Sequence, residues 1–67
     1  MFYIGNKVKM VRATDGAKKS KSEFVGQTGH ITARIKNGGE IMFGVSIDGV
    51  KTGYIWRASE LKFIDFK

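Results

Sequence analysis

The chain has 67 residues, twelve of them basic and six acidic, for a formal net charge of +6, and it contains no cysteine and no proline. This length allows one domain at the small end of what folds alone, and without cysteine no disulfide can stabilise it, so apolar side chains must supply the core. The first ten residues have too few apolar side chains for a signal peptide or a membrane span. We therefore expect one soluble domain over residues 1–67, located in the cytoplasm and making no contact with a membrane.

The excess positive charge lies in the first half of the chain. Residues 1–36 contain eight basic and two acidic side chains, whereas residues 37–67 contain four of each. Such asymmetry is typical of a protein that meets a polyanion on one surface, because neutralising phosphates releases condensed counterions. A small domain also uses lysine simply to remain dispersed. The charge therefore favours a polyanion partner without establishing one.

The first half of the chain predicts two strands separated by a long loop. Residues 7–11 alternate, with Val8 and Met10 on one face and lysines on the other. Residues 16–23 are rich in lysine and serine and have no apolar face, which predicts an exposed, mobile loop. The second strand is predicted at residues 30–35. Its inward residues are expected to be Ile31, Ala33 and Ile35.

The second half predicts three more strands. Residues 36–40 contain two glycines and form a turn into a strand at 41–47, and Asp48-Gly49 is the favoured two-residue turn into a strand at 50–56. A short helical turn is expected in "RASEL" before a last strand at 61–64. The third strand is expected to turn Ile41, Phe43, Val45 and Ile47 inward, together with Leu61, Phe63 and possibly Phe24 from elsewhere. Five short strands predict an all-β fold, a small and partly open barrel.

Several short motifs of the chain resemble those of KOW-type modules and other SH3-like barrels. They are the opening "GNKVKMV", the turn "GQTGHI", the alternating "IMFGV" and the late "SELKFI". Gly5, Val8 and Met10 match the opening of the family, and Gly26, Gly29 and Ile31 match its turn. The segment between Arg12 and Gly26 is longer and richer in lysine than in a minimal module. The resemblance implies an SH3-like barrel that works with RNA, DNA or the ribosome, although the same barrel also serves as an accessory subunit or a peptide-binding module.

Enzymatic activity is not expected. The chain has one histidine, and its carboxylates form no motif that pairs an acid with a base or a base with a nucleophile. His30 is more typical of a surface or binding-face residue than of a catalytic one. Gly26-Gln27-Thr28-Gly29 lacks the lysine, serine and helix that follow a phosphate-binding loop, so it predicts a turn. We expect no cofactor and no metal.

The segment "GYIWR" suggests a second kind of contact. If Ile55 points inward, Tyr54 and Trp56 share the outward face beside Arg57, and exposed aromatic rings next to cations can stack on unpaired bases. Trp56 can instead cover an open end of the barrel, and the same residue types also anchor protein interfaces. All three uses remain open from the sequence.

The predicted function is nucleic-acid or ribonucleoprotein binding in transcription or translation, with a small adaptor that docks on a larger protein complex as the alternative. The lysines of the loop supply phosphate contacts but do not read a base sequence. If the first two strands pair, their basic residues extend the same surface. The candidate nucleic-acid-binding residues are Lys7, Lys9, Lys18, Lys19, Lys21, His30, Arg34, Lys36, Tyr54, Trp56 and Arg57.

Overall fold

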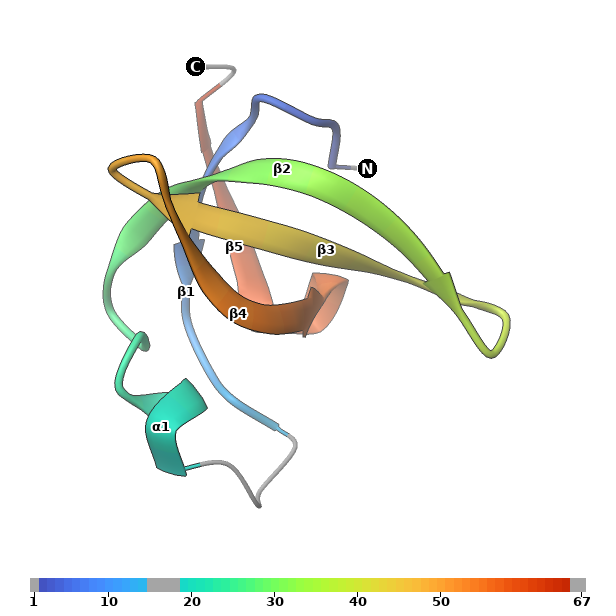
Figure 1. Ribbon diagram of the computed structural model, residues 1–67, viewed down its shortest axis with the longest axis horizontal. Helices are drawn as coiled ribbons and strands as arrows, with labels where there is room; N and C mark the ends of the chain where they lie inside the picture. Colours follow the sequence, from blue (N-terminus) through green and yellow to red (C-terminus); the bar gives the residue numbers. More distant parts are fainter. Residues whose placement is uncertain (1, 15–18, 66–67) are drawn as a thin grey trace.

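The structure, a computed structural model, describes residues 2–14 and 19–65, with only the backbone at Lys19 and Ser20. Its elements in chain order are β1 (Lys7–Met10), α1 (Lys19–Ser22), β2 (Thr28–Asn37), β3 (Glu40–Ile47), β4 (Val50–Arg57), the 3-10 turn η1 (Ala58–Glu60) and β5 (Leu61–Asp65). The predicted all-β class is confirmed. Figure 1 shows a strongly curved sheet in which β2 arches from β1 to the β2–β3 hairpin at the other end of the molecule.

The five strands of the described chain form one antiparallel sheet in the order β4-β3-β2-β1-β5. The predicted pairing of the first two strands is confirmed. The end strands β4 and β5 are joined along the chain by η1, the helical turn that the sequence predicts. Among the described residues no strand pairing joins β4 to β5. The sheet is therefore curled, with two end strands.

Both hairpin turns have the backbone conformation that their sequences predict. Gly38 and Gly39 have φ values of 60° and 88° between β2 and β3, and Asp48 and Gly49 have values of 51° and 80° between β3 and β4. Two consecutive residues with positive φ form the turn whose twist matches that of the flanking strands. These turns fix the register of the three longest strands.

The core lies on one face of the sheet, which we call the inner face. Its buried cluster consists of Val8, Met10, Ile31, Phe43, Val45, Trp56 and Leu61. Every member except Trp56 was predicted to point inward. Phe2, Phe24, Ile47 and Tyr54 are partly buried and pack against this cluster. The core is thus built from all five strands, because each supplies at least one of the buried side chains.

A register shift reverses the predicted facing of the later residues of β2. The β2–β3 pairing shifts between Ile31 and Ala33. Beyond this point Ala33 is opposite Gly44, and Ile35, predicted inward, lies on the outer face with 38% of its surface exposed. An extra residue in one strand changes which side chains face the core, because facing alternates strictly along a strand. The inward predictions for Ala33 and Ile35 were wrong for this reason.

Other predicted core residues lie at the margin of the core. Ile41 and Phe63 are 40% and 41% exposed, while Ile47 is partly buried. Ile41 still faces the same side as Phe43, but it comes next to the hairpin turn, where the sheet has little to cover it. Only the side chains near the middle of the inner face are therefore fully buried.

Gly29 marks the closest approach between β2 and its neighbour β3. A Cβ atom at this position would lie 2.5 Å from the carbonyl oxygen of Ser46 and 2.9 Å from Cγ1 of Val45. A side chain does not fit at such distances. The glycine therefore allows β2 to bend from its pairing with β1 into its pairing with β3.

The prediction of a structureless loop at residues 16–23 was wrong at Lys19–Ser22, which forms α1. Backbone hydrogen bonds from Phe24 to Lys21 and from Val25 to Ser22 continue this turn. Residues 15–18 lie outside the described part of the chain. No helix within that described part is long and apolar enough to cross a membrane.

Candidate nucleic-acid interface

Basic side chains from three neighbouring strands lie on the outer face, opposite the core. Lys7 and Lys9 alternate in β1 with the fully buried Val8 and Met10. In the sheet register Lys7 is opposite His30 of β2, and Lys9 is opposite Lys62 of β5. Residues directly opposite in an antiparallel pair share a face. We call this set, Lys7, Lys9, His30 and Lys62, the basic strip.

The two lysines opposite each other in the basic strip repel. Lys9 and Lys62 are both exposed, and like charges in directly opposite positions destabilise a sheet. One acidic residue, Asp65, is opposite Lys7, beyond a register shift between Lys7 and Val8. An anion bound over the strip would relieve the repulsion between Lys9 and Lys62.

Arg34 does not belong to this strip, although the sequence predicted a common surface with Lys7 and Lys9. It follows the register shift in β2 and lies opposite Phe43, which is on the inner face. Its guanidinium carbon lies 5.5 Å from the centre of the Tyr3 ring. Lys36, two residues further, is opposite Ile41 and exposed. The prediction of a single positive surface was therefore wrong, because the register shift separates the basic residues onto two faces.

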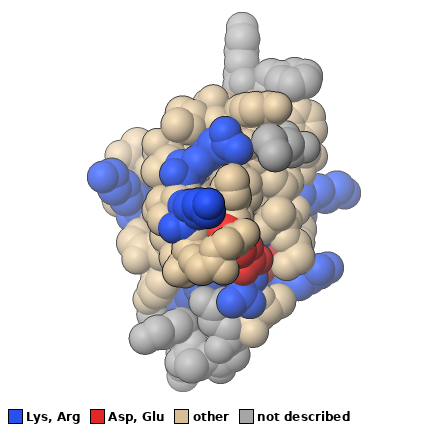
Figure 2. All heavy atoms as spheres, turned by 90° about the vertical axis from the view of Figure 1, so that its right-hand side faces the viewer, with Lys and Arg blue, Asp and Glu red and all other residues tan. Residues whose placement is uncertain are grey.

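The side of the molecule at which the β2–β3 hairpin ends also carries basic residues. Figure 2 shows lysine and arginine atoms near the centre of this side and projecting at its left and right edges, with a smaller group of acidic atoms between them. On this side, positive charge is therefore not confined to one patch.

Lys21 was predicted to be an exposed phosphate ligand, but its side chain is buried. Its ammonium group lies 3.2 Å from Oε1 of Glu60, donates a hydrogen bond of 3.0 Å to the carbonyl of Ile55, and lies 4.7 Å from the centre of the Trp56 ring. The side chains of both charged residues are at most 1% exposed. The prediction was wrong because an ammonium group can be buried when a carboxylate, a carbonyl oxygen and an aromatic face replace its contacts with water. Lys18 and the side chain of Lys19 lie outside the described part.

Glu60 accepts hydrogen bonds from several directions. Oε2 accepts from the backbone amide and the hydroxyl of Thr14, at 2.6 and 3.0 Å, and Oε1 accepts from the backbone amide of Arg57 at 2.8 Å. Burial by itself raises the pKa of Glu60, but the hydrogen bonds from Arg57, Thr14 and Lys21 outweigh it, so the pKa lies below its ordinary value of 4.5. The Glu60 carboxyl group is therefore ionised at neutral pH, and its contacts connect α1, η1 and the segment after β1.

Trp56 is not on the outward face, where it would lie only if Ile55 pointed inward. Trp56 is opposite Phe43 in the register and is fully buried, with its ring nitrogen donating to the hydroxyl of Thr52 at 3.2 Å. The condition is not met, because Ile55 is opposite Gly44 on the outer face. Trp56 therefore serves the core, the use that the sequence left open beside stacking.

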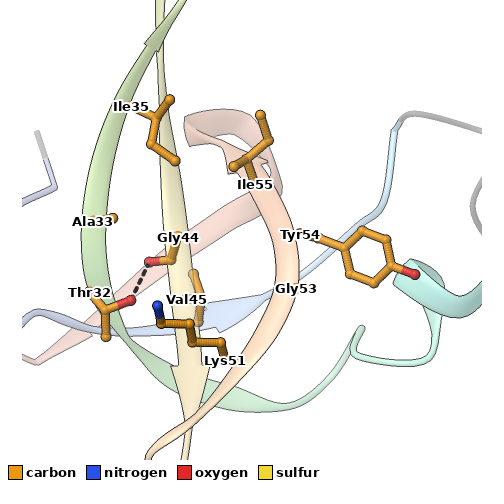
Figure 3. A pocket seen from close by; sticks show the side chains of 9 residues that line it. All are labelled: Thr32, Ala33, Ile35, Gly44, Val45, Lys51, Gly53, Tyr54 and Ile55. Carbon is orange, nitrogen blue, oxygen red and sulfur yellow. Dashed lines mark hydrogen bonds between the residues drawn. The ribbon is translucent and has the colours of Figure 1, made fainter.

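Tyr54 and Arg57, the other two residues of the predicted stacking site, each contact other side chains. Tyr54 is partly buried, and its ring centre lies 6.2 Å from that of Phe24. Figure 3 shows its side chain pointing away from the outer face, toward α1. Arg57 lies 3.6 Å from Glu40 across an ion pair whose two side chains are about half exposed. Neither residue forms a stacking surface with Trp56.

The outer face also has an apolar depression, drawn in Figure 3. Ala33 and Ile35 of β2 and Ile55 of β4 surround Gly44, which has no side chain to fill the space between the strands. The hydroxyl of Thr32 lies 3.5 Å from the carbonyl oxygen of Gly44 at the edge of this depression. A partly exposed apolar surface of this kind is available to a protein partner.

Three residues of this description were missed from the sequence. Lys62 follows the buried Leu61, so the alternation of the last strand could have placed it outward. Tyr3 and Glu60 gave no comparable signal, because their partners Arg34 and Lys21 are far away in the chain.

No protein-family model, curated protein or solved structure matches the chain. What the protein does must therefore be inferred from its own residues.

Proposed function

We propose that this protein is a non-enzymatic accessory of transcription or translation that binds nucleic acid or a ribonucleoprotein, and that its curled sheet is an SH3-like barrel of the KOW type. The observation that carries the proposal is the basic strip. It places Lys7, Lys9 and Lys62 together with His30 on an outer face made by three adjacent strands. Lysines in such an arrangement contact phosphates and do not read bases.

The electrostatics of the strip support this proposal. Opposite charges in directly opposite positions stabilise a sheet, and like charges destabilise it. Here Lys9 is opposite Lys62, and the chain as a whole has a net charge of +6. A polyphosphate backbone supplies the missing negative charge and gains from counterion release.

The experiment measures how binding depends on salt. Wild-type protein is titrated with RNA, single-stranded DNA and duplex DNA at several salt concentrations, and so is the variant Lys7→Gln/Lys9→Gln/Lys62→Gln. We expect the variant to bind all three more weakly and the slope of log affinity against log salt to flatten by about 2–3 units, at roughly 0.7–0.9 for each phosphate that is no longer neutralised. Lys51→Gln is the matched control, since Lys51 is exposed on β4 at the opposite end of the sheet order. An unchanged slope in the triple variant would contradict the proposal.

A second candidate is an adaptor that docks on a larger protein complex. The apolar depression around Gly44 favours it, because exposed Ile35 and partly exposed Ile55 give it an apolar surface. An interface of this kind weakens little as salt rises, whereas phosphate binding weakens steeply. If none of the three nucleic acids binds at low salt, the adaptor becomes the preferred function.

A further inference from the structure

We propose that Tyr3, Arg34 and a second apolar depression, which lies next to Arg34 and is distinct from the one around Gly44, bind an unpaired base. The nucleic acid that this protein prefers is then single-stranded. This inference rests on the proposed function and names its substrate class. The site is separate from the basic strip, since Arg34 faces the inner side of the sheet beyond the register shift.

Tyr3 presents an exposed aromatic ring from an ordered turn. Its residue surface is 55% exposed. Its backbone amide donates to the side chain of Asn6 at 2.9 Å, and the amide of Asn6 donates back to the carbonyl of Tyr3 at 3.1 Å. Asn6 is itself buried and its carbonyl accepts from the amide of Ile31 at 3.0 Å, which ties the turn to β2. The backbone that carries the ring is thus held in place, while more than half of the residue surface stays exposed.

Arg34 adds a cation beside this ring. Its guanidinium carbon lies 5.5 Å from the ring centre, within the range of a cation–π contact. A guanidinium group is planar and stacks on aromatic faces while its N–H groups reach phosphate oxygens. Lys36 is exposed on the same side of β2, two residues further along the strand. Ring and cations together match a base and its adjoining phosphates.

The depression next to Arg34 is apolar and has room for a flat group. It has a volume of about 270 Å³ and is lined by Phe2, Arg34, Ile41, Phe43 and Ala58. Phe2 packs edge-on against Phe43, with ring centres 5.4 Å apart, which forms one wall. Bases stack on such surfaces in proteins that bind single strands without sequence preference, because every base has a π face. The bases of a duplex are already stacked on each other and do not reach it.

The test compares two single strands that differ only in their bases. Fluorescence anisotropy is measured with oligothymidylate and with an abasic oligonucleotide of the same length and charge. We expect wild-type protein to bind oligothymidylate about 5- to 150-fold more tightly than the abasic strand, the effect of stacking on one base. Tyr3→Ala should remove this preference and leave the abasic affinity unchanged, and Tyr3→Phe should retain the preference. Thermal unfolding of each variant serves as the control for folding.

The outcomes separate this inference from the proposed function. If wild-type protein binds both strands equally, the base site is refuted while phosphate binding by the basic strip stands. If Tyr3→Ala keeps the preference for oligothymidylate, the site is also refuted. If neither strand binds at low salt, the proposed function fails and the inference fails with it.

Discussion

Lys21 and Glu60 form an ion pair in which Nζ and Oε1 are 3.2 Å apart and both side chains are excluded from solvent. The pair is separated by 39 positions in the chain, and the Trp56 ring lies against its ammonium group. Removing one partner of such a pair leaves an uncompensated charge in the interior. The stability of this small domain therefore depends on an ion pair between α1 and η1, in addition to the contacts between its strands.

Replacing Lys21 should strongly destabilise the fold. We expect Lys21→Met to lower the free energy of unfolding by about 3–5 kcal/mol, because Glu60 loses its counter-charge while it remains buried. Chemical denaturation measures this change. Lys62→Met is the control, since an exposed lysine should change the value by no more than about 0.5 kcal/mol. Equal stability of the two variants would show that the Lys21–Glu60 ion pair contributes nothing.

The stability should fall in acid, and Glu60 should account for a distinct part of the decrease. The pKa of Glu60 is lowered in the folded state, so its contribution is complete above about pH 4.5 and disappears as pH falls through the folded-state pKa. Denaturation curves of wild type and Glu60→Gln at a series of pH values test this. The difference in free energy of unfolding between wild type and Glu60→Gln should shrink as the pH falls through the folded-state pKa of Glu60. A difference that does not change with pH would contradict this prediction.

Phe43 should be one of the most costly core residues to truncate. It is 3% exposed and contacts Phe2 and Trp56 across the sheet. We expect Phe43→Ala to cost about 3–5 kcal/mol, because apolar burial decreases and a cavity remains. Val50→Ala, at a position that is 70% exposed, is the control and should have little effect. An unmoved thermal transition in Phe43→Ala would mean that β3 does not face the core in this register.

A methyl group at Gly29 should not be accommodated. The added Cβ would meet the backbone oxygen of Ser46 at 2.5 Å, so β2 and β3 would have to move apart. We expect Gly29→Ala to cost about 1–3 kcal/mol, typical of overpacking. Gly44→Ala is the comparison, because its nearest neighbour would be the Ala33 methyl at 3.3 Å, and it should cost less. Thermal unfolding of both variants measures this. A larger loss of stability in Gly29→Ala supports the close approach of β2 and β3, and an equal loss in both variants would contradict it.

The strands were predictable because their signals are local. Alternation along β1 placed Val8 and Met10 correctly, and Asp48-Gly49 marked the turn between β3 and β4. These patterns depend on neighbouring residues alone. Sequence reasoning therefore found the number and order of strands before any contact was known.

The errors arise where facing or burial depends on distant residues. Ile35 was assigned the wrong face because the register shift between Ile31 and Ala33 has no clear sequence mark. The face of Trp56 stayed open because the shift between Gly44 and Ser46 has none either. Lys21 resembled its exposed lysine neighbours, and only its carboxylate partner across the fold explains its burial. Of the candidate site, Lys7, Lys9 and His30 were placed on one face correctly by alternation, whereas the positions of Arg34 and Trp56 required the register.

The convergence of Thr14 and Lys21 on one carboxylate affects how the chain can vary. Both residues bind Glu60, one before and one after positions 15–18, so two separate parts of the described chain meet at one side chain. A substitution at Thr14 or at Lys21 leaves the same buried carboxylate with fewer partners. These two positions are therefore constrained by Glu60 and not by their own neighbours in the chain.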